Sequence, residues 1–128
     1  MSDSSFIVGI YEHPTRLATN TSVAQLHAEV AIGALKDAGL SKDDIDGYFC
    51  AGDAPGIGPL SILEYLGLDV SYADSTDIGG SSPIAQVGHA MRAIRDGKCK
   101  VALITSAGRP RSEEAAAGNL TERPEYPE

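Results

Sequence analysis

The residues that could carry out chemistry are concentrated in the stretch "STDIGGSSPIAQVGHAMRAI", residues 75–94. Gly79 and Gly80 allow a close backbone approach or a positive φ, and Ser81 and Ser82 follow them directly. A helix that begins here presents free backbone N–H groups and the positive end of its dipole. A hydroxyl at this point would be exposed, and a negative charge would be stabilised. The pattern is typical of a turn that presents a nucleophile or binds an anion.

Two interpretations of this turn remain open from residue types and spacing alone. In the first, Ser82 is only the N-cap of a helix, Pro83 is its first helical residue, and the two glycines form a tight turn. In the second, Ser81 and Ser82 are catalytic and line a substrate site together with Gly79 and Gly80. His89 lies about two helical turns beyond Ser82. A direct hydrogen bond between these two side chains is therefore not expected.

The remaining reactive residue types do not form a familiar site. Cys50 and Cys99 lack the CxxC spacing of zinc or redox centres, and we expect two buried, inert thiols. His13 and His27 have no partner at a metal-binding spacing, so both are expected at the surface or in loops and no metal site is expected. The glycine-rich stretch "GDAPGIG" lacks the Lys-Ser/Thr ending of a phosphate-binding loop.

The elements that must position the turn alternate along the chain. Apolar, β-branched runs predict strands, and apolar residues at helical spacing between them predict helices. Ser22 and Gly39 are placed to cap the first helix, and Gly67 to end the second. In the third helix the apolar stripe is expected at Ile84, Val87, Met91 and Ile94. The predicted strands are 5–11, 45–52, 70–76 and 100–108, and the predicted helices are 22–39, 59–67 and 83–96. This βαβαβαβ order predicts an α/β fold with a mostly parallel sheet and helices on both faces.

Composition limits the classes of partner. The 128 residues carry eighteen acidic and ten basic side chains, a net charge of −8, which argues against nucleic acid and anionic membranes. No apolar run approaches the length of a membrane span, and the N-terminus has no secretory signal pattern. Two cysteines form no disulfide framework, so a cytoplasmic location is expected. Residues 1–108 are predicted to form one α/β unit, and residues 109–128 a polar loop or a truncated continuation.

Several stretches together resemble the thiolase superfamily, in particular the lipid-transfer-protein or sterol-carrier-protein thiolase-like subgroup. These stretches run through residues 6–108 and are "IVGIYE", "AEVAIGALKDAGLSKDDIDGYFCAGDAPG", "LSILEYLGL", "DSTDIGGSSP" and "HAMRAIRDGKCKVALITSAG". The combination of "GDAPG", "EYLGL" and "DSTDIGGSS" is the part most specific to this subgroup.

The resemblance implies the first of the two similar halves of a thiolase. Thiolases mount their nucleophilic cysteine at the start of the third helix, a position that corresponds to residues 80–82 here, where no cysteine is present. A serine hydroxyl has a much higher pKa than a thiol and needs an adjacent base to attack a thioester. The implied function is therefore acyl transfer or retro-aldol carbon–carbon cleavage on acyl-CoA thioesters, with the nucleophilic cysteine apparently absent.

Alternatives to an enzyme remain. The same fold could serve as a non-catalytic lipid or acyl-CoA carrier or a scaffold protein, or the chain could be an inactive fragment. The resemblance further implies coenzyme A thioesters as substrates, no separate cofactor, a homodimer formed through residues 72–78, and an OB-fold partner protein.

Overall fold

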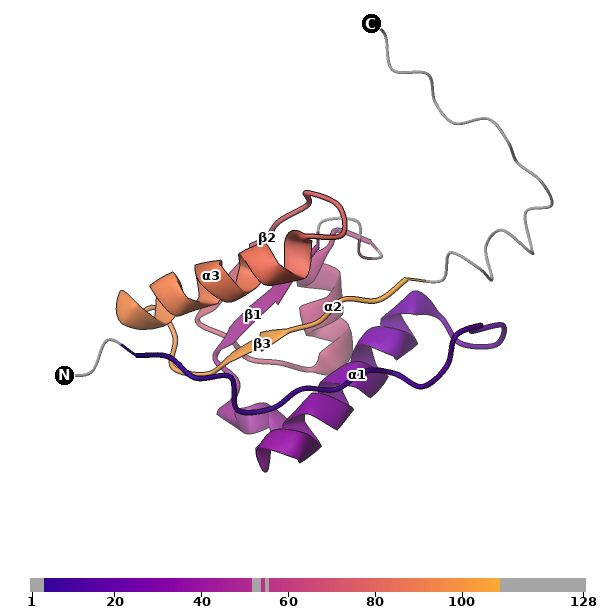
Figure 1. Cartoon of the computed structure of the whole chain (residues 1–128), viewed down its shortest axis with the longest axis horizontal. Coiled ribbons are helices and arrows are strands. Elements are labelled where there is room, and N and C mark those ends of the chain that lie inside the picture. Colours follow the sequence, from indigo (N-terminus) through magenta and orange to yellow (C-terminus); the bar gives the residue numbers. More distant parts are fainter. Residues whose placement is uncertain (1–3, 52–53, 55, 109–128) are drawn as a thin grey trace, which may run out of the picture.

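The computed structural model describes residues 4–51, 54 and 56–108 (Figure 1). The described residues form three α-helices, a short 3₁₀-helix and a three-stranded sheet. In chain order these are α1 (Val23–Ala38), η1 (Lys42–Asp44), β1 (Gly47–Cys50), α2 (Pro59–Leu66), β2 (Tyr72–Ser75), α3 (Ser82–Arg95) and β3 (Ala102–Ile104). The predicted α/β class is confirmed, while the predicted segment 109–128 lies outside the described residues.

The sheet is parallel, with the strand order β2-β1-β3. Gly47 of β1 is paired with Tyr72 on one side and with Ala102 on the other. Side chains of a strand alternate between its two faces. Tyr48 and Cys50 therefore belong to one core cluster, and Phe49 belongs to the other.

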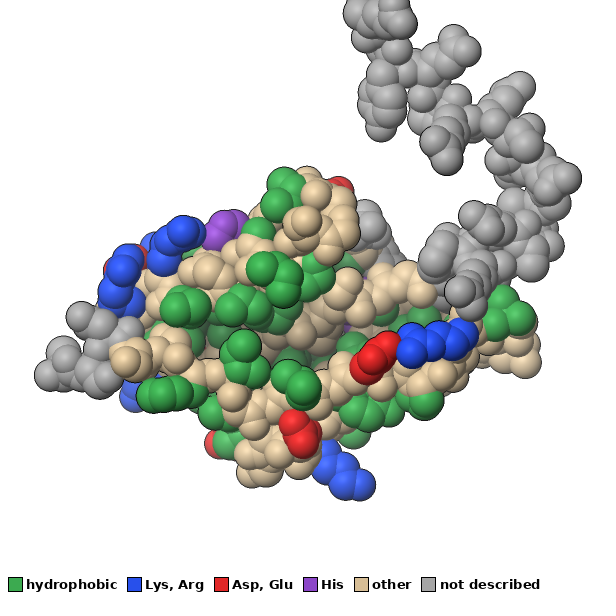
Figure 2. Space-filling model, viewed as in Figure 1, with side chains coloured by type: hydrophobic (Ala, Val, Ile, Leu, Met, Phe, Trp, Pro, Cys, Tyr) green, Lys and Arg blue, Asp and Glu red, His purple; other side chains and the backbone are tan. Residues whose placement is uncertain are grey.

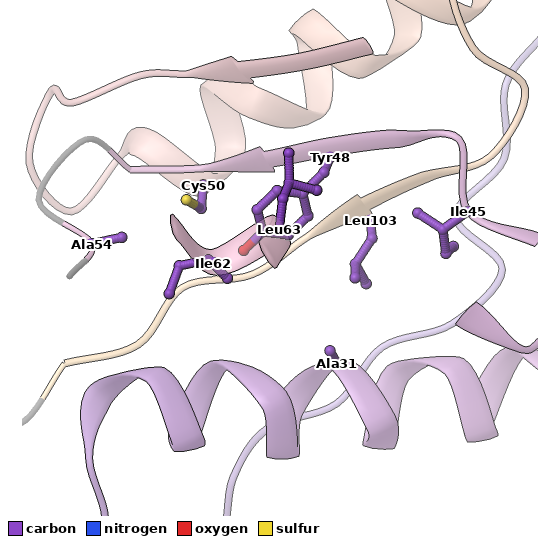
Figure 3. Packing of buried hydrophobic residues seen from close by; sticks show 8 residues of the cluster. All are labelled: Ala31, Ile45, Tyr48, Cys50, Ala54, Ile62, Leu63 and Leu103. Atoms are coloured by element: carbon purple, nitrogen blue, oxygen red, sulfur yellow. The ribbon is translucent and has the colours of Figure 1, made fainter. Parts of the chain in front are cut away.

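The two clusters define three layers. On one face, Tyr48, Cys50 and Leu103 of the sheet meet Ile62 and Leu63 of α2 and Ala31 of α1 (Figure 3). On the opposite face, α3 packs its small residues against the sheet. The helices thus cover both faces, as predicted, and α3 lies alone on its face among the described elements (Figure 1).

The predicted caps of α1 and the predicted C-terminal end of α2 are accurate. Ser22 accepts a hydrogen bond from the backbone N–H of Gln25, and Gly39 adopts φ 70° at the end of α1. Gly67 ends α2 with φ 66°. These three caps act through local backbone geometry, which is why the local sequence predicts them.

The predicted first strand, residues 5–11, is wrong in this structure because the segment forms no strand and packs along α1 instead. A Cβ placed on Gly9 would lie 2.6 Å from the carbonyl oxygen of Ala34, so the backbone itself contacts the helix. Tyr11 packs its ring over Gly33, and the N–H of Ile10 donates to the carboxylate of Asp37 at 2.8 Å. Since β1 and β3 pair directly, the sheet has three strands instead of four.

Candidate functional site

The turn at residues 79–82 connects the segment after β2 to α3. Gly79 adopts φ 76°, a left-handed conformation that favours glycine. The N–H of Ser82 donates to the carbonyl oxygen of Gly79 at 3.0 Å, which closes the turn. Cβ atoms added to Gly79 and Gly80 would meet no atom of the described residues within 4 Å, and both glycines are exposed. The turn therefore has open space beside its backbone.

The two serines of the turn have different environments. Ser82 is 1% exposed, and its hydroxyl donates to the carbonyl oxygen of Gly79 at 2.7 Å while accepting from the N–H of Ile78 at 2.8 Å. Ser81 is exposed and occupies the N-cap position, but its side chain makes no capping hydrogen bond. The prediction of Ser82 as the N-cap is therefore wrong by one residue. Ser82 ties the turn together through these two hydrogen bonds.

The first turn of α3 retains hydrogen-bond donor capacity. Pro83 has no N–H, and the N–H of Ile84 makes no hydrogen bond within the described residues. With the dipole of a 14-residue helix behind it, this end favours a negative charge or a polarised carbonyl oxygen. Chemically, the site can hold an acceptor group against backbone donors.

A polar cluster lies beside the turn and contains two residues that the sequence did not single out, Thr76 and Gln86. Thr76 Oγ1 is 3.0 Å from Nδ1 of His89, and its carbonyl oxygen accepts from Nε2 of Gln86 at 3.3 Å. Gln86 is 1% exposed, and its Oε1 is buried without a hydrogen-bond partner. The spacing of residues along α3 could have predicted that Gln86 is buried. Gln86 shares its helical face with Ser82, four residues before it, and with Ala90, four residues after it.

His89 is partly buried and contacts Thr76, as expected for a residue too far from Ser82 to bond to it. No serine–histidine pair forms within α3. The prediction for His27 is wrong, since this side chain is 2% exposed and lies in the core of the opposite face. His13 is in the segment before α1, where its Nε2 lies 2.6 Å from a carboxylate oxygen of Glu29.

A second polar network is buried on the α1 side of the sheet. Thr105 Oγ1 lies 2.7 Å from Nδ1 of His27 and 2.5 Å from the hydroxyl of Tyr48. Burial raises the pKa of Tyr48 well above its ordinary range, so this phenol stays protonated. All three side chains are at most 3% exposed. The network fixes β1, β3 and α1 together and is not accessible to a ligand from solvent.

The two cysteines are buried and form no disulfide, as expected. Burial raises the pKa of Cys99, and the nearby carboxylate of Asp46 raises it further. A raised pKa disfavours the nucleophilic thiolate. Within the described part of the chain, no group of three or more His, Cys, Asp or Glu side chains is arranged to hold a metal ion. None of the described helices is long and apolar enough to cross a membrane.

Comparisons with known proteins give a consistent fold. No protein-family model and no curated protein matches the chain. Among solved structures, it is similar to the Ltp2-ChsH2(DUF35) aldolase, with 20% identity and a TM-score of 0.60. It also resembles 3-oxoacyl-[acyl-carrier-protein] synthase III from Aquifex aeolicus VF5, with 24% identity and a TM-score of 0.57. A monomeric SCP2-thiolase like protein type 1 from Mycobacterium smegmatis is 26% identical, with a TM-score of 0.62.

The coverage of these similarities is unequal. The matches to the aldolase, the synthase and the SCP2-thiolase like protein cover 81%, 70% and 92% of this chain, respectively. They cover only 30%, 30% and 26% of those three proteins' own chains. The chain thus spans less than a third of the length of each solved structure. Over the matched residues, the three solved structures support the resemblance to thiolases that the sequence motifs indicate. The chain has a thiolase-like α/β fold.

Proposed function

We propose that residues 79–82 and the first turn of α3 bind the thioester group of an acyl-CoA, in a thiolase-like protein that performs acyl transfer or retro-aldol cleavage. The observation that carries this proposal is the open space at Gly79 and Gly80 directly before the N-terminus of α3. Backbone N–H groups there would polarise the thioester carbonyl, as in an oxyanion hole. No separate cofactor is required for this role.

The proposed binding is non-covalent. Ser82 is buried and its hydroxyl makes two hydrogen bonds, so it is not free to attack a carbonyl. Ser81 is exposed, but no described side chain lies within hydrogen-bond distance of its hydroxyl to act as a base. We therefore assign Ser81 to substrate contact and Ser82 to holding the turn, instead of assigning either residue to nucleophilic catalysis.

A second candidate is a non-catalytic carrier or scaffold that holds the same ligand. The observation in its favour is that the described residues contain no activated nucleophile, because Cys50 and Cys99 are buried and the pKa of Cys99 is raised. The two candidates share the binding site and differ only in turnover. The chain by itself is expected to bind without turning over its ligand, so turnover must be tested in the longest natural form of the protein.

The partners are also proposals. β2 pairs only with β1 among the described residues, so its other edge is available for a homodimer through residues 72–78. An OB-fold partner is proposed because one structural neighbour is a DUF35-containing aldolase complex. A cytoplasmic location is proposed because the two cysteines are buried and form no disulfide.

Calorimetric titration with acetyl-CoA tests the site. Gly80 adopts no left-handed conformation and a Cβ there meets open space, so Gly80→Val should fold and should abolish acetyl-CoA binding by filling the turn. Gly88→Ala is the control, because a Cβ on this glycine of α3 meets no atom of the part of the chain that the structure describes and it lies away from the turn. Unchanged affinity in Gly80→Val would remove the turn from the site.

A further inference from the structure

The face of α3 that packs on the sheet begins with polar side chains. The predicted apolar stripe is wrong at two of its members, since Ile84 is 76% exposed and Met91 is 49% exposed. The buried residues of the helix are instead Ser82, Gln86, Ala90 and Ala93. His89, three residues after Gln86, is partly buried beside this face. The N-terminal half of α3 therefore meets the rest of the chain through hydrogen-bonding groups.

Three side chains of α3 hold residues 76–79 against the helix. The Ser82 hydroxyl makes the two hydrogen bonds of the turn described above. One helical turn further along, Nε2 of Gln86 donates to the carbonyl oxygen of Thr76 at 3.3 Å. Nδ1 of His89 lies 3.0 Å from Oγ1 of the same threonine. Among these side chains, only the histidine gains or loses a proton between about pH 5 and 8.

The direction of the hydrogen bond between Thr76 and His89 follows from the available donors and acceptors. Among the described residues, Nδ1 of His89 is the only acceptor within hydrogen-bond distance of the Thr76 hydroxyl. The hydroxyl is therefore the donor, Nδ1 is unprotonated, and the ring proton is on Nε2. In this state Oε1 of Gln86 is buried without a hydrogen-bond partner. A buried acceptor without a donor is unfavourable, so this oxygen has capacity for one more hydrogen bond.

We propose that protonation of His89 turns the Thr76 hydroxyl from His89 to Gln86. A proton from solvent binds Nδ1, and the N–H that forms donates to Thr76 Oγ1, so the existing hydrogen bond reverses its direction. The hydroxyl proton of Thr76 then donates to Oε1 of Gln86. This oxygen belongs to the same amide group as Nε2, which already binds the carbonyl oxygen of Thr76, so a rotation of the two side chains joins them.

The exchange makes the attachment of residues 76–79 to α3 depend on pH. At neutral pH, Gln86 binds Thr76 through one hydrogen bond, and at acidic pH it binds Thr76 through two. The turn at residues 79–82 continues directly from this segment, so its hold on the helix tightens when His89 is protonated. The device concerns the geometry of the turn and does not depend on the function proposed above.

The titratable groups that face α3 from the sheet are uncharged or negative. Tyr72 of β2 and Cys99 belong to the cluster that packs on α3, and a phenol and a thiol carry no charge at neutral pH. Asp74 shares a face of β2 with Tyr72, and Asp77 directly follows Thr76. Both carboxylates are exposed, and both favour a positive charge nearby. The side chains that β1 and β3 add to this cluster are apolar, namely Phe49, Ala102 and Ile104.

The positive groups lie at the C-terminal end of α3. Arg92 and Arg95 are in its last turn, and Lys and Arg side chains gather at this end in Figure 2. Nζ of Lys98 lies 5.2 Å from the centre of the Tyr72 ring. Arg92, three residues after His89, opposes a second positive charge, whereas the two aspartates on the side of Thr76 favour it. Because His89 is only partly buried, its ring can take up a proton from solvent.

An NMR titration of the isotope-labelled chain between about pH 5 and 8 tests the exchange without any ligand. The ring signals of His89, the side-chain amide signals of Gln86 and the backbone amide signal of Ile78 should shift with one common midpoint. His89→Gln should abolish the shifts of Gln86 and Ile78. The matched control is His13→Gln, because His13 lies before α1 and contacts Glu29 there. This control should leave both shifts unchanged.

The Thr76 hydroxyl is tested by a pair of substitutions. Thr76→Val removes the hydroxyl, so His89 should still titrate while the side-chain amide of Gln86 no longer follows it. Thr76→Ser keeps the hydroxyl and should keep the common midpoint. Gln86 shifts that persist in Thr76→Val would overturn the exchange. The unmodified chain alone would also overturn it if the Gln86 amide signals stayed constant while His89 titrated, or if the His89 ring did not titrate in this range.

Discussion

The Ser82 hydroxyl donates to the carbonyl oxygen of Gly79 at 2.7 Å, so the residue that opens α3 also holds the glycine turn in place. The same hydroxyl accepts from the N–H of Ile78 at 2.8 Å. This arrangement gives Ser82 a structural role and leaves Ser81 as the exposed member of the pair. The two serines should therefore respond differently to the same substitution.

Ser82→Ala should lower the free energy of unfolding by about 1–3 kcal/mol, because it removes both hydrogen bonds of the Ser82 hydroxyl, and each such bond contributes about 0.5–1.5 kcal/mol. Ser81→Ala should change it by no more than about 0.5 kcal/mol, because the Ser81 side chain makes no capping hydrogen bond. Urea unfolding of both variants measures the difference. Equal effects of the two substitutions would show that Ser82 does not hold the turn.

Incubation of the chain with acetoacetyl-CoA should produce neither an acyl adduct nor enzyme-dependent thiolysis. The described residues offer no activated nucleophile at the turn, and a hydroxyl without a base reacts poorly with thioesters. Intact-mass spectrometry detects an adduct, and release of the free thiol of coenzyme A reports turnover. A mass increase that maps to Ser81 or Ser82 would contradict the non-covalent assignment.

Stability should fall at alkaline pH because the folded state keeps protons that the unfolded state loses. Burial raises the pKa values of both Tyr48 and Cys99 in the folded protein. In the unfolded chain the pKa is about 8.5 for Cys99 and about 10 for Tyr48. The free energy of unfolding should therefore begin to fall above about pH 8.5 because of Cys99, and fall more steeply above about pH 10 because of Tyr48. Each such group lowers the free energy of unfolding by up to about 1.4 kcal/mol per pH unit.

Tyr48→Phe provides the check. The variant should be less stable at neutral pH, because Thr105 loses its hydrogen bond to the phenol. Its stability should also decline less steeply above about pH 10 than that of the unmodified chain. Denaturant titrations at a series of pH values measure both effects. An unchanged alkaline slope would mean that Tyr48 does not remain protonated in the folded state.

The sequence was sufficient for features that depend on local geometry. Ser22 and Gly39 cap α1 as predicted, and the thiolase-like fold agrees with the solved structures that resemble this chain. The segment 5–11 shows where local reasoning fails. Its apolar, β-branched composition is typical of a strand, but Gly9 and Tyr11 pack on α1 instead. Strand propensity does not determine which partner a segment will contact.

In the candidate site too, local features could be predicted from the sequence and features that depend on packing could not. The position of the turn before α3 could be predicted from its glycines and Pro83, because these residues constrain the backbone directly. The cluster of Thr76, Gln86 and His89 could not, because it depends on how far α3 approaches the sheet. The small side chains of Ala90 and Ala93 permit that close approach. The helical spacing of apolar residues had instead predicted that larger side chains, such as Ile84 and Met91, would face the core.

An NMR titration of the isotope-labelled chain with acetyl-CoA and, separately, with free coenzyme A tests the acyl-thioester site most directly. We expect acetyl-CoA to shift the backbone amide signals of Gly79, Gly80, Ser81 and Ile84. Free coenzyme A should leave the Ile84 signal unchanged, because it has no thioester carbonyl. Saturable shifts confined to other regions, or none at the turn, would contradict the assignment of the α3 N-terminus as an acyl-thioester site.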